Sequence, residues 1–547
     1  MNRRTPAPAP RNRRVSRPVR GPLRKQPRFP PGAAQVGVRS DRVCPLLLRD
    51  QPRRNLENSV GLSHLRDSAM QACARRLKVL SGLILSVVLL PGCQNPRSAA
   101  GSGGSFRIGA AELDITPPVG YRMAGYFDER LATGVHDPLK AKALVLQQGN
   151  ERVALVFCDL IGLSLNVTTN ARAQASRRTG IPKANIVISA THSHTGPLFD
   201  DVRRYYFHQA AVAEHGTDPH ETIDYPAFLI ERLVQVIVAA QKNLRPAKLE
   251  AGIARQEGLA FNRRYWMKNG KVVFNPGQLN PNIVRPAGPS DPDVGILLAR
   301  EPGARQPFAG ATIFAMHSDT VGGTLFSADY EYYVEQTLRQ AFGTNFISAF
   351  GLGTCGDLNH INVDKKEPTS GFEVAKRIGR TLGQTVIEAS PHLTLIEKPS
   401  LAVRTKTLQA PLEEATPQQK DEARSMLDKL ADGKTDFYTR VTTVKVLDLE
   451  QRGSSWPMEV QVIRLDADTA LVCLPGEIFV ELGLAIKRDS PFKRTMVMSI
   501  CNDRPSYVPT LKAFKEGSYE VINSRVKPGA GEQLVETASG MLRELRE

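Results

Sequence analysis

From Phe106 onward, short apolar runs alternate with longer segments in which apolar residues recur at helical spacing. Apolar runs predict strands over 141–146, 152–158, 185–190, 248–254, 293–299, 309–316, 346–350, 442–449, 459–465, 470–474 and 495–500. Helical spacing predicts helices over 165–179, 226–244, 331–341, 371–389 and 530–545, and an amphipathic surface helix over 415–432. The pattern is typical of one large mixed α/β domain over 106–547, built on β-sheet with flanking helices and with its active site at the strand ends.

Charge is concentrated at the beginning of the chain. Of the formal net charge of +17, residues 1–69 carry +12 and residues 70–93 carry three more, which leaves +2 for residues 94–547. The folded part is therefore nearly neutral, and we expect no nucleic-acid partner for it. Residues 1–69 are rich in Arg and Pro and predict a disordered extension. They are either a basic arm for nucleic acid or membrane, or a stretch upstream of a true translation start at Met70.

The segment 70–93 has the layout of a secretory signal peptide. Three positive charges precede an apolar stretch over 79–90, and "LPGC" and a Gly/Ser-rich linker over 94–105 follow. The end of this segment is similar to a bacterial lipobox, in which Cys93 would be lipidated and would hold the protein at a membrane surface. A plain signal peptide or a single anchor helix is the alternative. Each reading predicts export, as a cell-envelope lipoprotein or a secreted protein.

Four further cysteines, Cys158, Cys355, Cys473 and Cys501, lie at or near apolar strand-like runs. Their spacing matches no zinc knuckle and no disulfide framework. Buried free thiols are the expected reading, with a single disulfide as the alternative.

The stretch "ISATHSHTGPLFDD" places His192 and His194 two residues apart after an apolar run. In a strand, residues i and i+2 point to the same side. If the extended run continues, both imidazoles face one site, as at the start of many metal centres. A structural pair that is hydrogen-bonded at a strand end is the alternative.

Other potential ligands also follow short apolar runs. They are His317, Asp357, Asn359, His360, Glu477, Asp503 and Tyr507. Strand ends gathered at one edge of a sheet are where α/β proteins build sites. Taken singly, Glu477 could cap a helix, His317 could be a satisfied core histidine and Tyr507 could serve packing. Taken together, two histidines and a carboxylate predict a catalytic zinc site with an open position for water.

The chain resembles the neutral ceramidase family (neutral/alkaline non-lysosomal ceramidase, N-terminal domain) from about Phe106 to Tyr519. The resemblance rests on "GAAELDITPPVGYRMAGY", "GVHDPLKAKALVL", "NIVISATHSHTGP", "FAMHSDT", "GTCGDLNHIN", "LPGEIFVELG" and "PSYVPT". It implies four zinc ligands, which are His192, His317, Glu477 and Tyr507. It also implies that His194 and Tyr519 support the metal ligands or polarise the substrate, and that Arg263 in "FNRRYW" lies near the reacting group.

Two departures from the family concern the substrate. Asn359 stands where ceramidases carry an active-site serine, and an amide cannot act as an acyl nucleophile. Water activated by zinc can still attack a carbonyl, with His194 or His360 as general acid or base, and Asn359 or His360 could orient the substrate. After Tyr519 the sequence has 28 residues, so we expect no C-terminal immunoglobulin-like domain within it.

Three functions are therefore carried forward. The first is an exported zinc-dependent hydrolase of C–N amide bonds that converts N-acyl-sphingosine to sphingosine and fatty acid. The second is a zinc hydrolase of another amide or an ester. The third is a metal-binding lipoprotein without catalysis. The partners expected are a lipid or N-acyl small molecule and a membrane surface contacted through Cys93.

Overall fold

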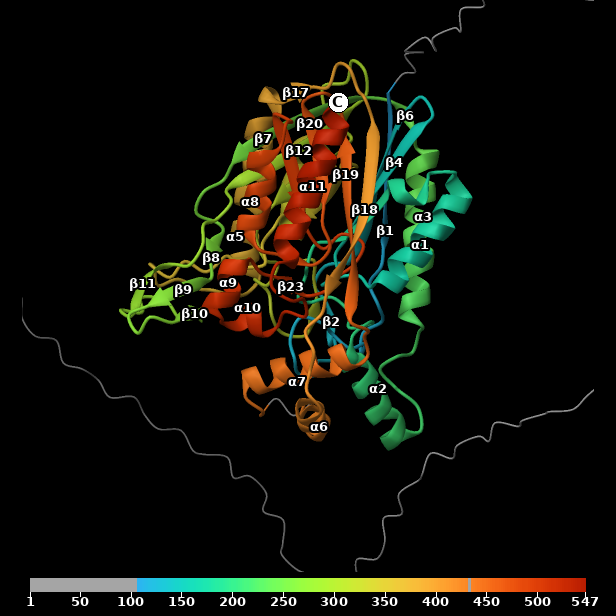
Figure 1. Ribbon diagram of the computed structural model, residues 1–547. Coiled ribbons are helices and arrows are strands. Elements are labelled where there is room, and N and C mark those ends of the chain that lie inside the picture. Colours follow the sequence, from blue (N-terminus) through green and yellow to red (C-terminus); the bar gives the residue numbers. More distant parts are fainter. Residues whose placement is uncertain (1–105, 431–433) are drawn as a thin grey trace, which may run out of the picture. The chain divides into compact units, whose positions relative to one another are not determined.

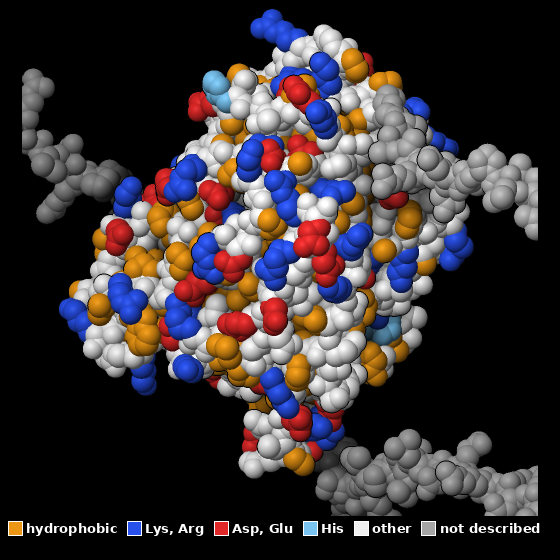
Figure 2. All heavy atoms as spheres, turned by 45° about the horizontal axis from the view of Figure 1, so that its top comes forward, with side chains coloured by type: hydrophobic (Ala, Val, Ile, Leu, Met, Phe, Trp, Pro, Cys, Tyr) orange, Lys and Arg blue, Asp and Glu red, His pale blue; other side chains and the backbone are white. Residues whose placement is uncertain are grey.

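The computed structural model of the chain describes residues 106–430 and 434–547 (Figure 1). The expectations for the extension 1–69, the signal peptide 70–93 and the linker 94–105 lie outside these residues. Within the described part, no helix is both long enough and apolar enough to cross a membrane. Figure 2 shows basic and acidic side chains interspersed on the face in view, as the nearly neutral charge predicts.

Three mixed sheets carry the fold. The first has the order β5 (Ile186–Ala190), β4 (Glu151–Cys158), β3 (Lys140–Gln148), β1 (Arg107–Asp114), β6 (Arg245–Pro246). The second has the order β15 (Ile347–Leu352), β13 (Ala309–Phe314), β12 (Asp293–Arg300), β7 (Lys248–Arg255), β17 (Thr394–Leu395). The third has the order β18 (Ala402–Pro411), β19 (Ser455–Arg464), β20 (Thr469–Cys473), β22 (Arg494–Met498). Each sheet contains one parallel pair at an edge, β4–β5, β13–β15 and β20–β22.

Each sheet is covered by a pair of helices. The pairs are α1 (Leu165–Thr179) with α3 (Tyr225–Lys242), α4 (Tyr330–Phe342) with α5 (Phe372–Ala389), and α8 (Val480–Asp489) with α11 (Ala530–Arg546). On the other side, the sheets share one apolar cluster that includes Leu155, Leu297 and Leu471. This arrangement confirms the mixed α/β class, with flanking helices around β-sheet.

The parallel edge strands of the three sheets end at one place. The amide of Ala190, at the end of β5, donates to Ile500 O at 3.2 Å, and Ser499 N donates to Leu352 O at 2.8 Å at the end of β15. Parallel neighbours point their carboxyl ends the same way, and loops at such ends are where α/β sheets bind ligands. The loops that carry the candidate residues therefore start close together.

Shorter elements surround these strand ends. They are β2 (Gly134–Val135) with β14 (Leu325–Phe326), β8 (Phe261–Asn262) with β16 (Leu358–Asn359), β21 (Glu477–Ile478) with β23 (Tyr507–Val508), and the three-stranded sheet β10 (Val272–Phe274), β9 (Arg264–Met267), β11 (Ile283–Pro286). The remaining helices are α2 (Val202–His215), α6 (Pro417–Ser425), α7 (Phe437–Glu450), α9 (Leu511–Glu516), α10 (Tyr519–Ile522) and the 3-10 turns η1 (Lys183–Asn185), η2 (Ser390–His392) and η3 (Leu427–Lys429).

Two predicted elements are wrong in type or length. Residues 442–449 are not a strand but part of α7, although β-branched residues dominate them. Asp436 caps this helix by accepting from Thr439 N. Buried Val444 and Leu447 pack in one cluster with Val202 of α2 and Ala423 of α6, so packing overrides the strand propensity. The helix predicted over 415–432 ends as α6 at Ser425 and continues only as a short 3-10 turn. The four cysteines are free and buried, as expected.

Candidate functional site

The loop that follows β5 presents both histidines of the "THSHTGP" motif. The strand ends at Ala190, and His192 lies in the left-handed region with φ of 71°, so the expectation of a continuing strand is wrong. The two rings nevertheless lie 4.9 Å apart, centroid to centroid. The backbone amide of His192 donates to Leu160 O at 2.9 Å and that of His194 donates to Ser318 O at 3.1 Å. Contacts with neighbouring loops, rather than the strand period, turn both imidazoles to one side.

His192, His317 and Glu477 converge from the loops that end β5, β13 and β20. The Nε2 atom of His192 lies 3.0 Å from the Nε2 atom of His317. Glu477 Oε2 lies 3.4 Å from Nε2 of His192 and 3.8 Å from Nε2 of His317. A tetrahedral zinc ion with ligand bonds of about 2.0–2.1 Å would hold two donor atoms about 3.3 Å apart. The three observed separations bracket this value.

The outer nitrogens of both histidines are held by backbone carbonyls. His192 Nδ1 lies 2.6 Å from Ile161 O, and His317 Nδ1 lies 3.2 Å from Cys355 O. A ring nitrogen facing a carbonyl carries the hydrogen, so Nε2 of each ring is left with a free lone pair. Two lone pairs that face each other at 3.0 Å, beside a carboxylate, fit a cation held between them.

Glu477 does not cap the helix that follows it. The first amide of α8, Val480 N, donates to Asp357 Oδ1 at 2.8 Å instead, and Glu477 Oε2 is buried without a hydrogen-bond partner. Burial alone would raise the pKa of Glu477, but the neighbouring imidazoles of His192 and His317 hold it well below its usual value. The carboxylate is thus ionised, and its Oε2 atom accepts no hydrogen bond, as suits a metal ligand.

Tyr507 adjoins Glu477 because their strands β23 and β21 pair in parallel, with these two residues in register. The Tyr507 hydroxyl accepts a hydrogen bond from Arg263 Nη2 at 3.0 Å. The guanidinium of Arg263 also binds Glu520 at 2.9 Å and the carbonyl of Gly356 at 2.8 Å. Burial and the charge of Glu477 raise the pKa of Tyr507 well above its usual value. Tyr507 is therefore a protonated phenol unless a cation is bound beside it.

His194 and Tyr519 complete this side of the site. One ring nitrogen of His194 lies within 4.8 Å of a ring nitrogen of each of His192 and His317. Neither nitrogen of His194 has a hydrogen-bond partner, and burial lowers its pKa to about 3, so the ring is a neutral base. The Tyr519 ring lies 5.5 Å from that of Tyr507, and its hydroxyl accepts from Asn523 Nδ2 at 3.2 Å.

Asn359 and His360 turn away from these groups. The amide of Asn359 donates to Asn275 Oδ1 at 3.0 Å, and its oxygen accepts from Ile361 N at 3.1 Å. His360 Nε2 lies 2.7 Å from Thr369 O, and its Nδ1 lies 3.4 Å from Asp319. Among the described residues, neither side chain lines the cavity that reaches His192, His194, Glu477, Tyr507 and Tyr519.

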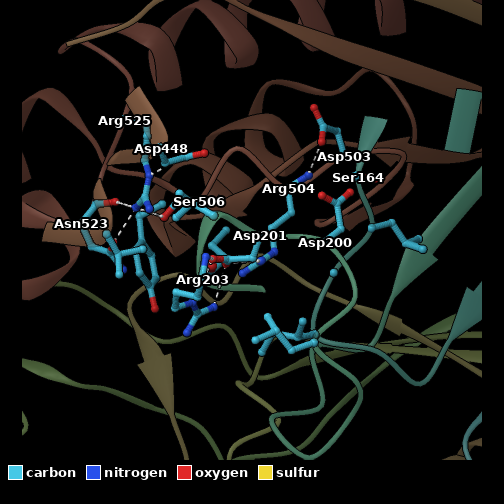
Figure 3. Close-up of a pocket in the computed structure, with 18 of the residues that line it drawn as sticks. Ser164, Asp200, Asp201, Arg203, Asp448, Asp503, Arg504, Ser506, Asn523 and Arg525 are labelled. Atoms are coloured by element: carbon cyan, nitrogen blue, oxygen red, sulfur yellow. Dashed lines mark hydrogen bonds and ion pairs between the residues drawn. The ribbon is translucent and has the colours of Figure 1, made fainter. Parts of the chain in front are cut away.

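That cavity has a volume of about 350 Å³, and its wall combines apolar side chains with a group of charged ones (Figure 3). Its charged lining comprises Asp200, Asp201, Arg203, Asp448, Arg452, Asp503, Arg504 and Arg525. Most of these residues were not predicted from the sequence, because they come from α2, α7 and four loops that meet only in the fold. Asp319 was also missed, although it lies two residues after His317. Although burial opposes ionisation, the hydrogen bond to His360 and the charges of nearby histidines hold the pKa of Asp319 well below its usual value.

Comparison with known proteins shows which family this chain resembles. Residues 106–363 match the family model "Neutral/alkaline non-lysosomal ceramidase, N-terminal". A neutral ceramidase of Pseudomonas aeruginosa is 25% identical over 306 residues, which are 54% of this chain and 42% of that protein. One from Oryza sativa subsp. japonica is 29% identical over 193 residues, which are 33% of this chain and 23% of that protein. The chain thus spans less than half the length of these curated relatives.

Solved structures extend the similarity beyond residue 363. The crystal structure of the Pseudomonas aeruginosa neutral ceramidase matches with a TM-score of 0.61 and 19% identity, over 81% of this chain and 74% of that chain. A structure described as "Ceramidase complexed with C2" matches with a TM-score of 0.62 and 18% identity, over 81% and 75%. The resemblance to the neutral ceramidase family is therefore confirmed, and the chain has the neutral ceramidase fold.

Proposed function

Since residues 106–363 match the neutral ceramidase family, we propose that this protein is a zinc-dependent hydrolase of C–N amide bonds, with an N-acyl lipid such as ceramide as its substrate. The observation that carries the proposal is the pair of Nε2 atoms of His192 and His317, 3.0 Å apart, with Glu477 Oε2 at 3.4 and 3.8 Å. Hydrolysis breaks the C–N bond, gives the hydroxyl of water to the acyl carbon and returns a proton to the nitrogen.

The donor set fits zinc. Two imidazoles, one carboxylate and the Tyr507 phenol are ligands that zinc accepts, with room for one further ligand. His192, His317, Glu477 and Tyr507 would hold the ion, which would polarise the scissile carbonyl and lower the pKa of water. The carbonyls of Ile161 and Cys355 fix the orientation of both imidazoles.

The remaining candidates take roles that follow from their contacts. His194 is neutral and free of hydrogen-bond partners, so it can accept a proton from water and pass it to the leaving nitrogen. It is better placed than His360, which does not line the cavity. Tyr519 can donate its hydroxyl hydrogen to the developing oxyanion. Arg263 acts through the Tyr507 hydroxyl, to which it donates. The contacts of Asn359 favour a structural role.

The residue difference at position 359 bears on which substrate this protein hydrolyses. With Asn359 in place of the serine, the water route is the one available, and it serves another amide or an ester as well as ceramide. A charged cavity wall favours a substrate with a polar part. Loss of catalysis with retention of the metal is the third possibility, and it predicts binding without turnover.

Export is a separate proposal that rests on residues 70–93, and it adds a lipid at Cys93 that holds the domain 106–547 at a membrane. Mass spectrometry of the mature N-terminus tests it. We expect a chain that begins at Cys93 and carries the mass of its acyl groups. Recovery of residues 1–69 on the mature protein would overturn export.

Two measurements on the purified protein test the catalytic proposal. Elemental analysis should find about one zinc per chain, and a panel of N-acyl lipids, N-acyl amino compounds and esters should release fatty acid. Less than about half an equivalent of zinc would overturn the metal site. Zinc at full occupancy with no turnover of any panel member would leave only the binding protein.

A further inference from the structure

Four arginines among the described residues line the cavity, and three of them pair closely with carboxylates of its wall. Arg203 forms two hydrogen bonds with Asp201, at 2.9 and 2.7 Å. Arg525 donates to Asp448 at 3.1 Å and also binds Ser506 and Asn523. Arg452 pairs with the same Asp448 at 2.9 Å and stacks 3.4 Å above the ring of Trp456. Each of these three guanidinium groups therefore already has a close carboxylate partner.

The fourth, Arg504, is different. Within residues 106–430 and 434–547 its guanidinium donates no hydrogen bond, and its ion pair with Asp201 is long, at 3.8 Å. That carboxylate already serves Arg203. Figure 3 shows Arg504 between Asp200, Asp201 and Asp503, in the middle of the lining residues. Its side chain is 21% exposed. Arg504 thus presents unused donors to the cavity that reaches Glu477 and the histidines.

A glycine sets the position of this side chain. A Cβ added at Gly162 would lie 2.3 Å from Cδ and 2.5 Å from Nε of Arg504. The aliphatic part of the Arg504 side chain therefore lies directly on the backbone of the loop that follows β4. Any residue type other than glycine at position 162 would place its Cβ in this space. Such a support limits the freedom of a long side chain and lowers the entropy cost of binding a ligand.

We propose that Arg504 is a specificity-determining residue that binds a carboxylate on the amine part of the substrate, so that N-acyl amino acids are the preferred amides. The proposal rests on the proposed amide hydrolysis at the neighbouring metal site. A planar guanidinium with free donors matches a carboxylate in two parallel hydrogen bonds. The Asp201 carboxylate lies 3.8 Å from Arg504 and leaves its donors free, so that one substrate carboxylate can bind them, whereas the nearby Asp200 and Asp201 disfavour a dianion such as phosphate.

The kinetic test compares N-lauroylglycine with N-lauroylethanolamine, which carries a neutral hydroxyl in place of the carboxylate. We expect the wild-type protein to favour N-lauroylglycine in kcat/KM by about 10- to 100-fold, the range for a hydrogen-bonded charged group. Arg504→Gln should reduce this preference to about threefold or less, mainly through KM. Arg488→Gln is the matched control, because Arg488 is 71% exposed and pairs with Asp489 at the surface. A preference that survives Arg504→Gln, or a wild-type preference for the ethanolamine, would overturn the proposal.

Calorimetry separates this proposal from the proposed function. If neither amide is hydrolysed, N-lauroylglycine should still bind at least about tenfold more tightly than N-lauroylethanolamine, and Arg504→Gln should abolish the difference. That result would support the carboxylate site while hydrolysis fails. Equal binding of both ligands to the wild-type protein would overturn the carboxylate site. Turnover of both amides without dependence on Arg504 would overturn it while hydrolysis stands.

Gly162→Ala tests the support of Arg504 without removing the charge. The added methyl must displace the Arg504 stem, so the preference for N-lauroylglycine should fall by about threefold or more, with zinc content and circular dichroism unchanged. Gly453→Ala is the control, since its Cβ would meet nothing within 4 Å. An unchanged preference in Gly162→Ala would show that the glycine does not position Arg504, and the kinetics of Arg504→Gln then decide the specificity alone.

Discussion

Two loops of the site, residues 191–195 after β5 and residues 353–361 after β15, start from neighbouring strand ends but use their polar groups in opposite ways. In the first, His194 has no hydrogen-bond partner and His192 keeps one nitrogen free toward His317. In the second, Asp357 is bonded to Asn262 and Val480, and Asn359 to Asn275 and Ile361. The free histidine nitrogens mark the first as the reactive loop, and the hydrogen-bonded side chains of Asp357 and Asn359 mark the second as the loop that builds its frame.

The second loop also packs closely against the segment that carries Glu477. A Cβ at Gly356 would lie 2.5 Å from Glu477 O, and Gly356 N donates to Ile478 O at 2.8 Å. The same residue accepts from Arg263, which holds Tyr507. The frame therefore positions two of the proposed ligands without contributing a ligand itself.

The largest expected effect comes from removing both histidine ligands, His192 of the reactive loop and His317 beside it. His192→Ala combined with His317→Ala should reduce zinc content from about one equivalent to below about a tenth, and kcat by at least about a thousandfold, because two of the proposed ligands are gone. Elemental analysis and fatty-acid release measure the two effects. Full retention of zinc or of activity would show that these histidines are not the metal ligands and would contradict the division into a reactive loop and a frame loop.

A smaller effect should follow from disturbing the frame beneath Glu477. Gly356→Ala forces the Glu477 backbone to move, and we expect zinc affinity to fall by about 10- to 100-fold, the range for changes that misorient a ligand. Competition with a zinc chelator measures the affinity, and Gly453→Ala serves as the control. If zinc affinity is unchanged, the packing of Gly356 against Glu477 does not position this ligand.

The charge of the frame loop should appear in the pH dependence of stability. Burial raises the pKa of Asp357 to about 6, against about 3.9 in an unfolded chain. The folded state therefore binds the proton more tightly, and this residue's contribution to stability falls as pH rises from about 4 to 6 and stays low above that. Relative to wild type, Asp357→Asn should gain about 1–3 kcal/mol in free energy of unfolding between pH 4 and pH 7.5. Urea unfolding at the two pH values measures the gain, and a difference that does not change with pH contradicts it.

The smallest effect should come from Asn359. Asn359→Ala and Asn275→Ala should each cost about 1–2 kcal/mol of stability, because each leaves a polar partner unpaired, while zinc content stays at the wild-type level. A double-mutant cycle should give a coupling of about 1 kcal/mol. Additive losses would mean that the two amides do not support each other. Loss of zinc in Asn359→Ala would show that Asn359 supports the metal site and is not only structural.

Local sequence signals predicted much of the fold. The helix predicted over 165–179 is α1, which Ser164 caps and which ends at Gly180 in the left-handed conformation, because caps and breakers act within a few residues. The strand predicted over 442–449 is wrong, because these residues belong to helix α7, where burial against neighbouring helices outweighs the strand propensity of β-branched residues. The strand argument for His192 and His194 failed as well, since the chain leaves the extended conformation at His192.

By itself, the sequence determined the class of the fold, the order of its elements and the residue types that end its strands, since these follow from hydrophobic period and local backbone preference. It also carried the motifs of the neutral ceramidase family. Only the tertiary structure decided which polar atoms stay unpaired, because Ile161 beside His192, Asn275 beside Asn359 and Asp201 beside Arg504 come from segments far away in the chain. The distinction between ligand, frame and specificity residue therefore lies in contacts that no local pattern records.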